Sequence, residues 1–127
     1  MSNEFEIGTI VTAAYKTGEY VGEIVEISSS GKAAVKIKAV IKHPTQGDLH
    51  NPMDPNVPFF HQRRALSDGE IALMPMYTVK PFNGTVQEYR ISLERALYTE
   101  IRKLEEQAQW VARSLQELGQ LKKDYTL

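Results

Sequence analysis

The sequence predicts a mainly β protein with a helical C-terminal part: a small SH3-like antiparallel barrel followed by one long or two shorter helices. Up to residue 84, short runs of β-branched and alternating apolar residues are separated by glycine-containing turns. From residue 85 onward, apolar residues recur every three or four positions instead. The 127 residues, of which 42% are hydrophobic, suit one core. We therefore expect a single domain over residues 1–127, with a barrel over residues 1–84 and a helical tail over residues 85–127 packed on it.

Three strands are expected in the first third of the chain. The runs at residues 10–15 and 20–27 are separated by a turn in which Gly18 can adopt a positive φ. A second turn, at residues 28–31, precedes the clearest pattern, an apolar–polar alternation over residues 35–42. The alternation assigns Lys36 and Lys38 to solvent and assigns Val35, Ile37, Ala39 and Ile41 to the core.

The middle of the chain loses this periodicity from His43 to Pro58. Four prolines fall within the stretch, which excludes a helix or a central strand and predicts a long ordered or semi-ordered loop. We expect a fourth strand over residues 59–66 and a turn at Asp68–Gly69. A fifth strand is expected over residues 70–80, bent or interrupted at Pro75.

The last third predicts helix. Thr85 and Glu88 have the spacing of a capping box, so the helix should begin at Val86. The apolar stripe continues to Leu118, and Gly119 is the expected stop.

The length of this helix raises the question of what covers its apolar stripe. A straight helix of this extent would be about 50 Å long, longer than the barrel is wide. We therefore expect a break near residues 105–109, so that the helix folds back and packs on the barrel. The same three-four spacing also permits a coiled-coil dimer.

Several kinds of chemistry have no support in the sequence. The chain has no cysteine, which excludes disulfides and zinc–thiolate sites. It has neither a Gly-x-Ser-x-Gly elbow nor a glycine-rich phosphate loop. We therefore expect no catalytic residues, no metal, no cofactor and no enzymatic activity. A metal site or a hydrolase that uses the histidines and aspartates of the loop is a less favoured alternative.

Nucleic acid is the main alternative ligand. Four lysines at positions 32, 36, 38 and 42, with Arg63 and Arg64, could form a basic patch on a small barrel. The formal net charge is −1, however, and lysines on the outer face of a strand commonly protect a sheet edge. We therefore expect a protein partner and no nucleic acid.

The loop and the strand expected after it form the candidate binding surface. Proline lowers the entropy cost of holding one loop shape, and arginine is suited to carboxylates on a partner. Adjacent strand residues point to opposite faces, so only one of Phe59 and Phe60 can enter the core. The candidate partner-binding residues are His43, Gln46, Asp48, His50, Phe59, Phe60, His61, Arg63 and Arg64.

Residues 14–18, 20–23, 42–50 and 57–66 together resemble the kinase-associated protein B family of spore-forming Gram-positive bacteria. The resemblance runs nearly end to end and is weakest over residues 99–109. It implies a non-enzymatic protein that supports activation of a membrane sensor histidine kinase feeding the sporulation phosphorelay. It supplies no established binding residues.

The sequence also gives an expectation of location. The first residues are acidic and contain no apolar run, and no stretch reaches the length of a membrane span. We therefore expect a cytoplasmic protein that meets the membrane only through its kinase. Because the chain has no cysteine to carry a lipid, we expect that it is not a lipoprotein.

Overall fold

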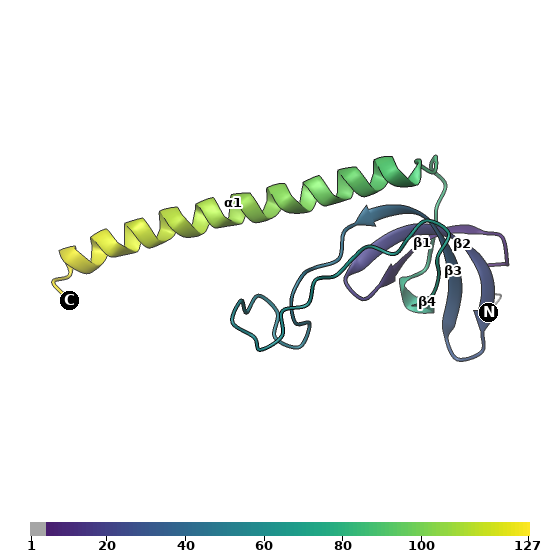
Figure 1. The fold of residues 1–127 in the computed structure, drawn as a ribbon, viewed down its shortest axis with the longest axis horizontal. Helices are drawn as coiled ribbons and strands as arrows, with labels where there is room; N and C mark the ends of the chain where they lie inside the picture. Colours follow the sequence, from purple (N-terminus) through teal and green to yellow (C-terminus); the bar gives the residue numbers. More distant parts are fainter. Residues whose placement is uncertain (1–4) are drawn as a thin grey trace. The chain divides into compact units, whose positions relative to one another are not determined.

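The computed structural model describes residues 5–127 and contains one antiparallel sheet and one long helix (Figure 1). The elements are β1 (Ile10–Tyr15), β2 (Gly18–Ser28), β3 (Lys32–Lys42), β4 (Ile71–Pro75), the 3-10 turn η1 (Met76–Thr78), β5 (Lys80–Pro81) and α1 (Tyr89–Asp124). The strand order is β4-β3-β2-β1-β5, and every pairing is antiparallel. The chain divides into two compact units, Met1–Leu97 and Tyr98–Leu127. The predicted class, a small barrel-like β domain followed by helix, is confirmed.

The first unit is a curled sheet around a small core. The curl brings β4 close to β1, although the two are not hydrogen-bonded neighbours. The largest fully buried side chains come from β1 to β4: Val11, Tyr20, Ile24, Val35, Ile37 and Met74. In the β1–β2 turn the positive φ belongs to Lys16 and not, as predicted, to Gly18. The missing side chain of Gly18 instead leaves room for the Tyr20 ring.

A β-bulge in β3 overturns one predicted core position. Glu19 of β2 lies opposite Lys42 and Tyr20 lies opposite Val40, so Ile41 has no partner across the ladder. Lys38 is skipped in the same way, between Ile37 and Ala39, so the alternation is already lost before Ile41. Val40 is buried whereas Ile41 is 46% exposed. The prediction for Ile41 is therefore wrong. The expected burial of Val35, Ile37 and Ala39 and exposure of Lys36 are confirmed, whereas Lys38 is half-buried.

The last two strands also differ from the expectation. Residues 59–66 form no strand, and the backbone groups of Arg63 and Leu66 bond to side chains rather than to a neighbouring ladder. The interruption at Pro75 is confirmed, since η1 follows β4 directly. After η1 the chain forms β5, which pairs with β1 and supplies the fifth strand.

The helix begins later and runs further than the sequence suggested. It starts at Tyr89, and the carboxylate of Glu88 accepts a hydrogen bond from the Ile91 N–H at 3.1 Å, so Glu88 is the N-cap in place of Thr85. The predicted break at residues 105–109 is wrong, because this Glu-Glu-Gln-Ala-Gln stretch contains only good helix formers. Gly119 does not stop the helix either. No helix within residues 5–127 combines the length and apolar composition needed to cross a membrane.

The start of the helix is bonded to the sheet through a buried serine. The Val40 N–H of β3 donates to the Ser92 hydroxyl oxygen at 2.9 Å, and that hydroxyl donates to the Tyr89 carbonyl at 2.8 Å. Ser92 is almost fully buried. The bulge at Ile41 lies next to the same N–H, for which the Ser92 side chain supplies an acceptor.

We expect the bulge to separate the effects of two isoleucine substitutions. Ile37→Ala removes a fully buried side chain and should lower the free energy of unfolding by about 2–5 kcal/mol. Ile41→Ala removes a half-exposed side chain and should cost less than about 1.5 kcal/mol. Urea denaturation of both variants measures the difference, and equal losses would contradict the bulged register.

The serine bond predicts a second effect on stability. Ser92→Ala leaves the buried Val40 N–H without an acceptor and should lower the free energy of unfolding by about 1–3 kcal/mol. Thr99→Ala, an exposed change on the same helix, is the control and should alter it by less than about 0.5 kcal/mol. A Ser92→Ala variant as stable as this control would show that the bond contributes nothing.

Candidate functional site

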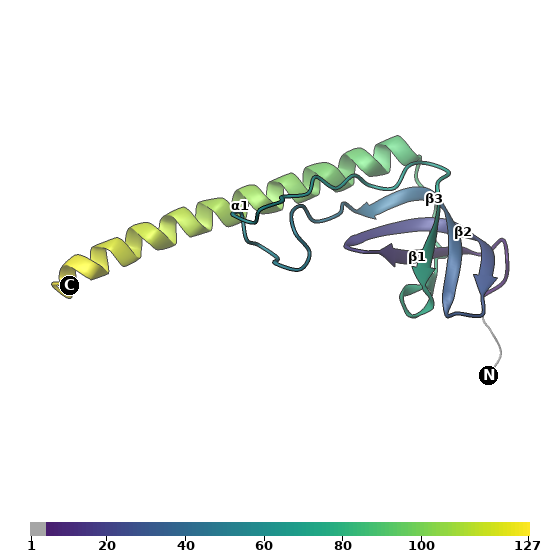
Figure 2. The same ribbon diagram turned by 60° about the horizontal axis from the view of Figure 1, so that its bottom comes forward.

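The candidate site is built on the long connection from β3 to β4 (Figure 1, Figure 2). We call the side chains of residues 43–66 the loop surface. The connection contains no strand or helix, so its backbone polar groups must find other partners. The strand predicted at residues 59–66 is replaced by a loop held in place by side chains.

Gln46 holds the two halves of the loop together. Its side-chain oxygen accepts from the Arg63 N–H at 2.8 Å, and its amide nitrogen donates to the Arg63 carbonyl at 2.9 Å. One amide side chain thus satisfies both backbone groups of Arg63, as a neighbouring strand would. Next to it, the Gly47 N–H donates to the His61 carbonyl at 2.9 Å.

Two tyrosines fix the end of the loop at Leu66. The Leu66 N–H donates to the Tyr20 hydroxyl oxygen at 3.2 Å, and the Tyr89 hydroxyl donates to the Leu66 carbonyl at 2.6 Å. Burial is the main cause that raises the pKa of both tyrosines above the usual value. The Tyr89 hydroxyl therefore keeps the proton that it donates throughout the neutral range.

The aspartate and histidines of the loop are placed for structure. The Asp48 carboxylate accepts from the His50 N–H at 2.9 Å and from the Asn51 side chain at 3.0 Å. The Asn51 bond, followed by the His50 bond, lowers the pKa of Asp48. The His43 ring is bonded to the Pro44 carbonyl. Within residues 5–127, no histidine ring is hydrogen-bonded to a carboxylate, and no three His, Asp or Glu side chains are grouped to hold a metal ion.

Both phenylalanines of the loop are exposed. Phe59 is 69% exposed and stacks on the His61 ring, with ring centroids 4.4 Å apart. Phe60 is 53% exposed and lies over Gly47, whose φ of +100° favours glycine and where a side chain would meet the Phe60 ring. The expectation that one of the two enters the core is therefore wrong, because residues 59–66 do not join the sheet.

A cationic cleft of about 190 Å³ lies between the loop and the β1–β2 turn. Its lining includes Lys16, Arg63 and Arg64, together with the aromatic rings of Tyr15 and Tyr20, and none of the described residues that line it carries a carboxylate. None of these three cations is ion-paired with any of residues 5–127. Arg63 donates through Nε to the Gly47 carbonyl at 3.2 Å, whereas Arg64 is exposed and makes no hydrogen bond with the described residues. The cleft is therefore suited to an anionic group.

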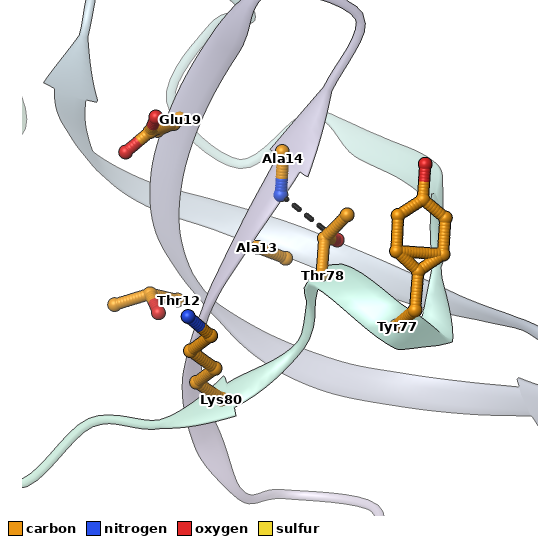
Figure 3. A pocket seen from close by; sticks show the side chains of 7 residues that line it. All are labelled: Thr12, Ala13, Ala14, Glu19, Tyr77, Thr78 and Lys80. Atoms are coloured by element: carbon orange, nitrogen blue, oxygen red, sulfur yellow. Dashed lines mark hydrogen bonds between the residues drawn. The ribbon is translucent and has the colours of Figure 1, made fainter.

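A second pocket, of about 300 Å³, lies beside β1 and differs in charge (Figure 3). Its lining contains one cation, Lys80, and one carboxylate, Glu19. The Thr78 hydroxyl in this pocket accepts from the Ala14 N–H at 3.1 Å and donates to the Pro75 carbonyl. Since its charges balance and this hydroxyl is already bonded, we favour the cationic cleft as the binding site.

The structure brings together part of the predicted residue set. Gln46, Phe60, His61 and Arg63 surround Gly47, and Arg64 lines the cleft next to them. Asp48 and His50 form a separate turn, and the His43 ring is hydrogen-bonded to the carbonyl of the next residue, Pro44. Sequence reasoning missed Lys16, Tyr20 and Tyr89, which are distant along the chain. Of these three residues, only Lys16 had a local signal in the sequence, which is its place in a tight turn.

Comparison with known proteins covers almost the whole chain. The family described as Kinase associated protein B matches residues 15–126. A protein of Bacillus subtilis (strain 168) named Kinase-associated lipoprotein B is 47% identical over 122 residues, 95% of this chain and 94% of that protein. The X-ray crystal structure of kinase-associated protein B from Bacillus cereus has 40% sequence identity and a TM-score of 0.67. The structural match covers 97% of this chain and 99% of the Bacillus cereus chain.

One of these names corrects an expectation. The Bacillus subtilis relative is named a lipoprotein, which contradicts our expectation of a cytoplasmic protein that is not a lipoprotein. That expectation rested on two absences from the 127 residues, a cysteine and an apolar N-terminal run. Absences of this kind do not establish where a protein resides.

The names of these relatives support a kinase-associated accessory role. The resemblance seen in residues 14–18, 20–23, 42–50 and 57–66 is confirmed by matches that extend well beyond these segments. The chain belongs to the kinase-associated protein B family.

Proposed function

We propose that this protein is a non-enzymatic accessory protein that binds a membrane sensor histidine kinase feeding the sporulation phosphorelay and supports its activation. The class of kinase and the pathway come from what the family resemblance implies. The binding face is our inference from the loop surface. The observation that carries it is a cleft with three cations that form no ion pair within residues 5–127, next to two exposed phenylalanines, on a loop whose backbone is fixed.

Charge selects the kind of segment that the cleft binds. An acidic segment of the kinase would supply the carboxylates that Lys16, Arg63 and Arg64 lack within this chain. Arginine side chains bind carboxylates in a bidentate manner, and they are enriched at protein interfaces. Since Arg64 makes no bond within residues 5–127, binding a carboxylate breaks no existing interaction of this side chain.

Apolar area and rigidity add to the charge. Phe59 and Phe60 offer aromatic surface of the kind that anchors protein interfaces. The bonds from Gln46, Tyr20 and Tyr89 hold the loop backbone before binding, which lowers the entropy cost of association. The positions of Asp48 and the histidines favour a structural role for them over a catalytic one.

Removing the Arg64 side chain should weaken kinase binding and leave the fold intact. Arg64→Ala should raise the dissociation constant for the purified full-length kinase about tenfold, which is about 1.4 kcal/mol. Its melting temperature should stay unchanged, because the side chain is exposed and unpaired. The control variant is Lys32→Ala, which also removes one positive charge. Lys32 is the first residue of β3, and the loop surface follows the other end of that strand, so this variant should bind the kinase normally.

Titration of the kinase with each variant in the same buffer measures these effects. Normal binding by both Arg64→Ala and Arg63→Ala would reject the loop surface. If Arg102→Ala or Lys103→Ala on the helix abolished binding instead, the helix would be the recognition element.

The Gln46 bonds predict a different outcome. Gln46→Ala leaves both backbone groups of Arg63 without partners and should lower the free energy of unfolding by about 1–2 kcal/mol. Gln46→Glu can still accept from the Arg63 N–H but cannot donate to its carbonyl, so its loss should be intermediate. Thermal denaturation measures both variants, and a Gln46→Ala protein as stable as the unmodified chain would contradict the role given to Gln46.

A further inference from the structure

The C-terminal unit, Tyr98–Leu127, is a single helix up to Asp124 and carries a long apolar seam. The seam residues alternate at spacings of three and four, which is the pattern of a coiled coil rather than of an irregular apolar face. Leu115 and Leu118 are 65% and 60% exposed. The seam consists of Ile101, Leu104, Ala108, Val111, Leu115 and Leu118.

The charges beside the seam disfavour a parallel pairing with a second copy. Glu100 directly precedes Ile101 of the seam. In a parallel pair, Glu100 would face Glu105 of the second copy. Lys122, which is the next position in the three-four pattern after Leu118, would face its own equivalent in the same layer. Both contacts bring like charges together.

An antiparallel pairing removes both conflicts. The register that matches every seam layer sets Ile101 against Leu118, Leu104 against Leu115 and Ala108 against Val111. Lys122 of one copy then lies within about one helical turn of Glu100 of the other. Glu100 and Lys122 therefore lie near each other only when the helices run in opposite directions.

Gly119 fits the same register. It lies inside the helix without a positive φ, and a side chain there would meet no atom within 4 Å. Within residues 5–127, no contact accounts for a residue that weakens a helix interior. In the antiparallel register Gly119 faces Tyr98 of the second copy, and a missing side chain there gives room to an aromatic ring.

We propose that this helix binds a second copy of the chain through an antiparallel two-helix seam centred between Ala108 and Val111. The seam shares no residue with the loop surface, so the failure of one proposal would not count against the other. Because the paired segment is short, self-association should be weak, with a dissociation constant on the order of 10–100 µM.

Sedimentation equilibrium of the full chain at about 5–500 µM tests the association. Leu115→Glu places a charge in the seam and should raise the dissociation constant at least about tenfold. Gln116→Glu adds the same charge next to the seam and should leave it unchanged. Circular dichroism checks that both variants keep the helix.

Disulfide trapping tests the direction, since the chain has no cysteine of its own. Antiparallel pairing predicts that a Gln107→Cys protein cross-links with a Ser114→Cys protein and not with an Ala112→Cys protein. Parallel pairing predicts the reverse, and that result would overturn the proposal.

The other possible occupants give distinct outcomes. A chain that stays monomeric at about 500 µM overturns the proposal whatever else is seen. If such a monomer lost melting temperature on Leu115→Glu, the seam would pack on its own domain. If it lost kinase binding instead, the seam would be a kinase contact.

Discussion

The loop between β3 and β4 depends on one constraint: its backbone N–H and C=O groups have no strand beside them, so many of them must be satisfied by side chains. Gln46 does this for Arg63, and Tyr20 and Tyr89 do it for Leu66. Because the segment does not join the sheet, it has no buried face. Its phenylalanines remain exposed, and its arginines line the cationic cleft.

The same bonds connect the loop to the rest of the first unit. Tyr20 lies in the core, and Tyr89 is the first residue of the helix, so the end of the loop is bonded to both. Ser92, one turn further along, holds the helix start to Val40 beside the β3 bulge. A change at the start of the helix should therefore affect the loop surface as well as the core.

Several local signals in the sequence were informative. Alternation and turn residues located β1 to β3, prolines located the long loop and the interruption at Pro75, and the change of period located the helix. Ile41 was misassigned because a bulge depends on how two strands pair, which no single strand encodes. The helix start was misplaced because Thr85 and Glu88 fit a capping box one turn too early.

The candidate site was predicted in part. Gln46, Arg63 and Arg64 could be chosen from composition, but the Gln46–Arg63 bonds join residues 17 positions apart and the Tyr20–Leu66 bond joins residues 46 apart. Such contacts follow from the tertiary fold and leave no pattern in the neighbouring residues. For this reason a segment held by side chains was interpreted as a strand.

Hydrogen exchange of the free and the kinase-bound protein tests the central claim most directly. In the free protein, the Arg63 and Leu66 amides should exchange slowly although they belong to no strand, because each has a fixed side-chain acceptor. On binding the kinase, protection should increase over residues 59–64. Fast exchange of both amides in the free protein, or new protection only outside the loop, would contradict the account.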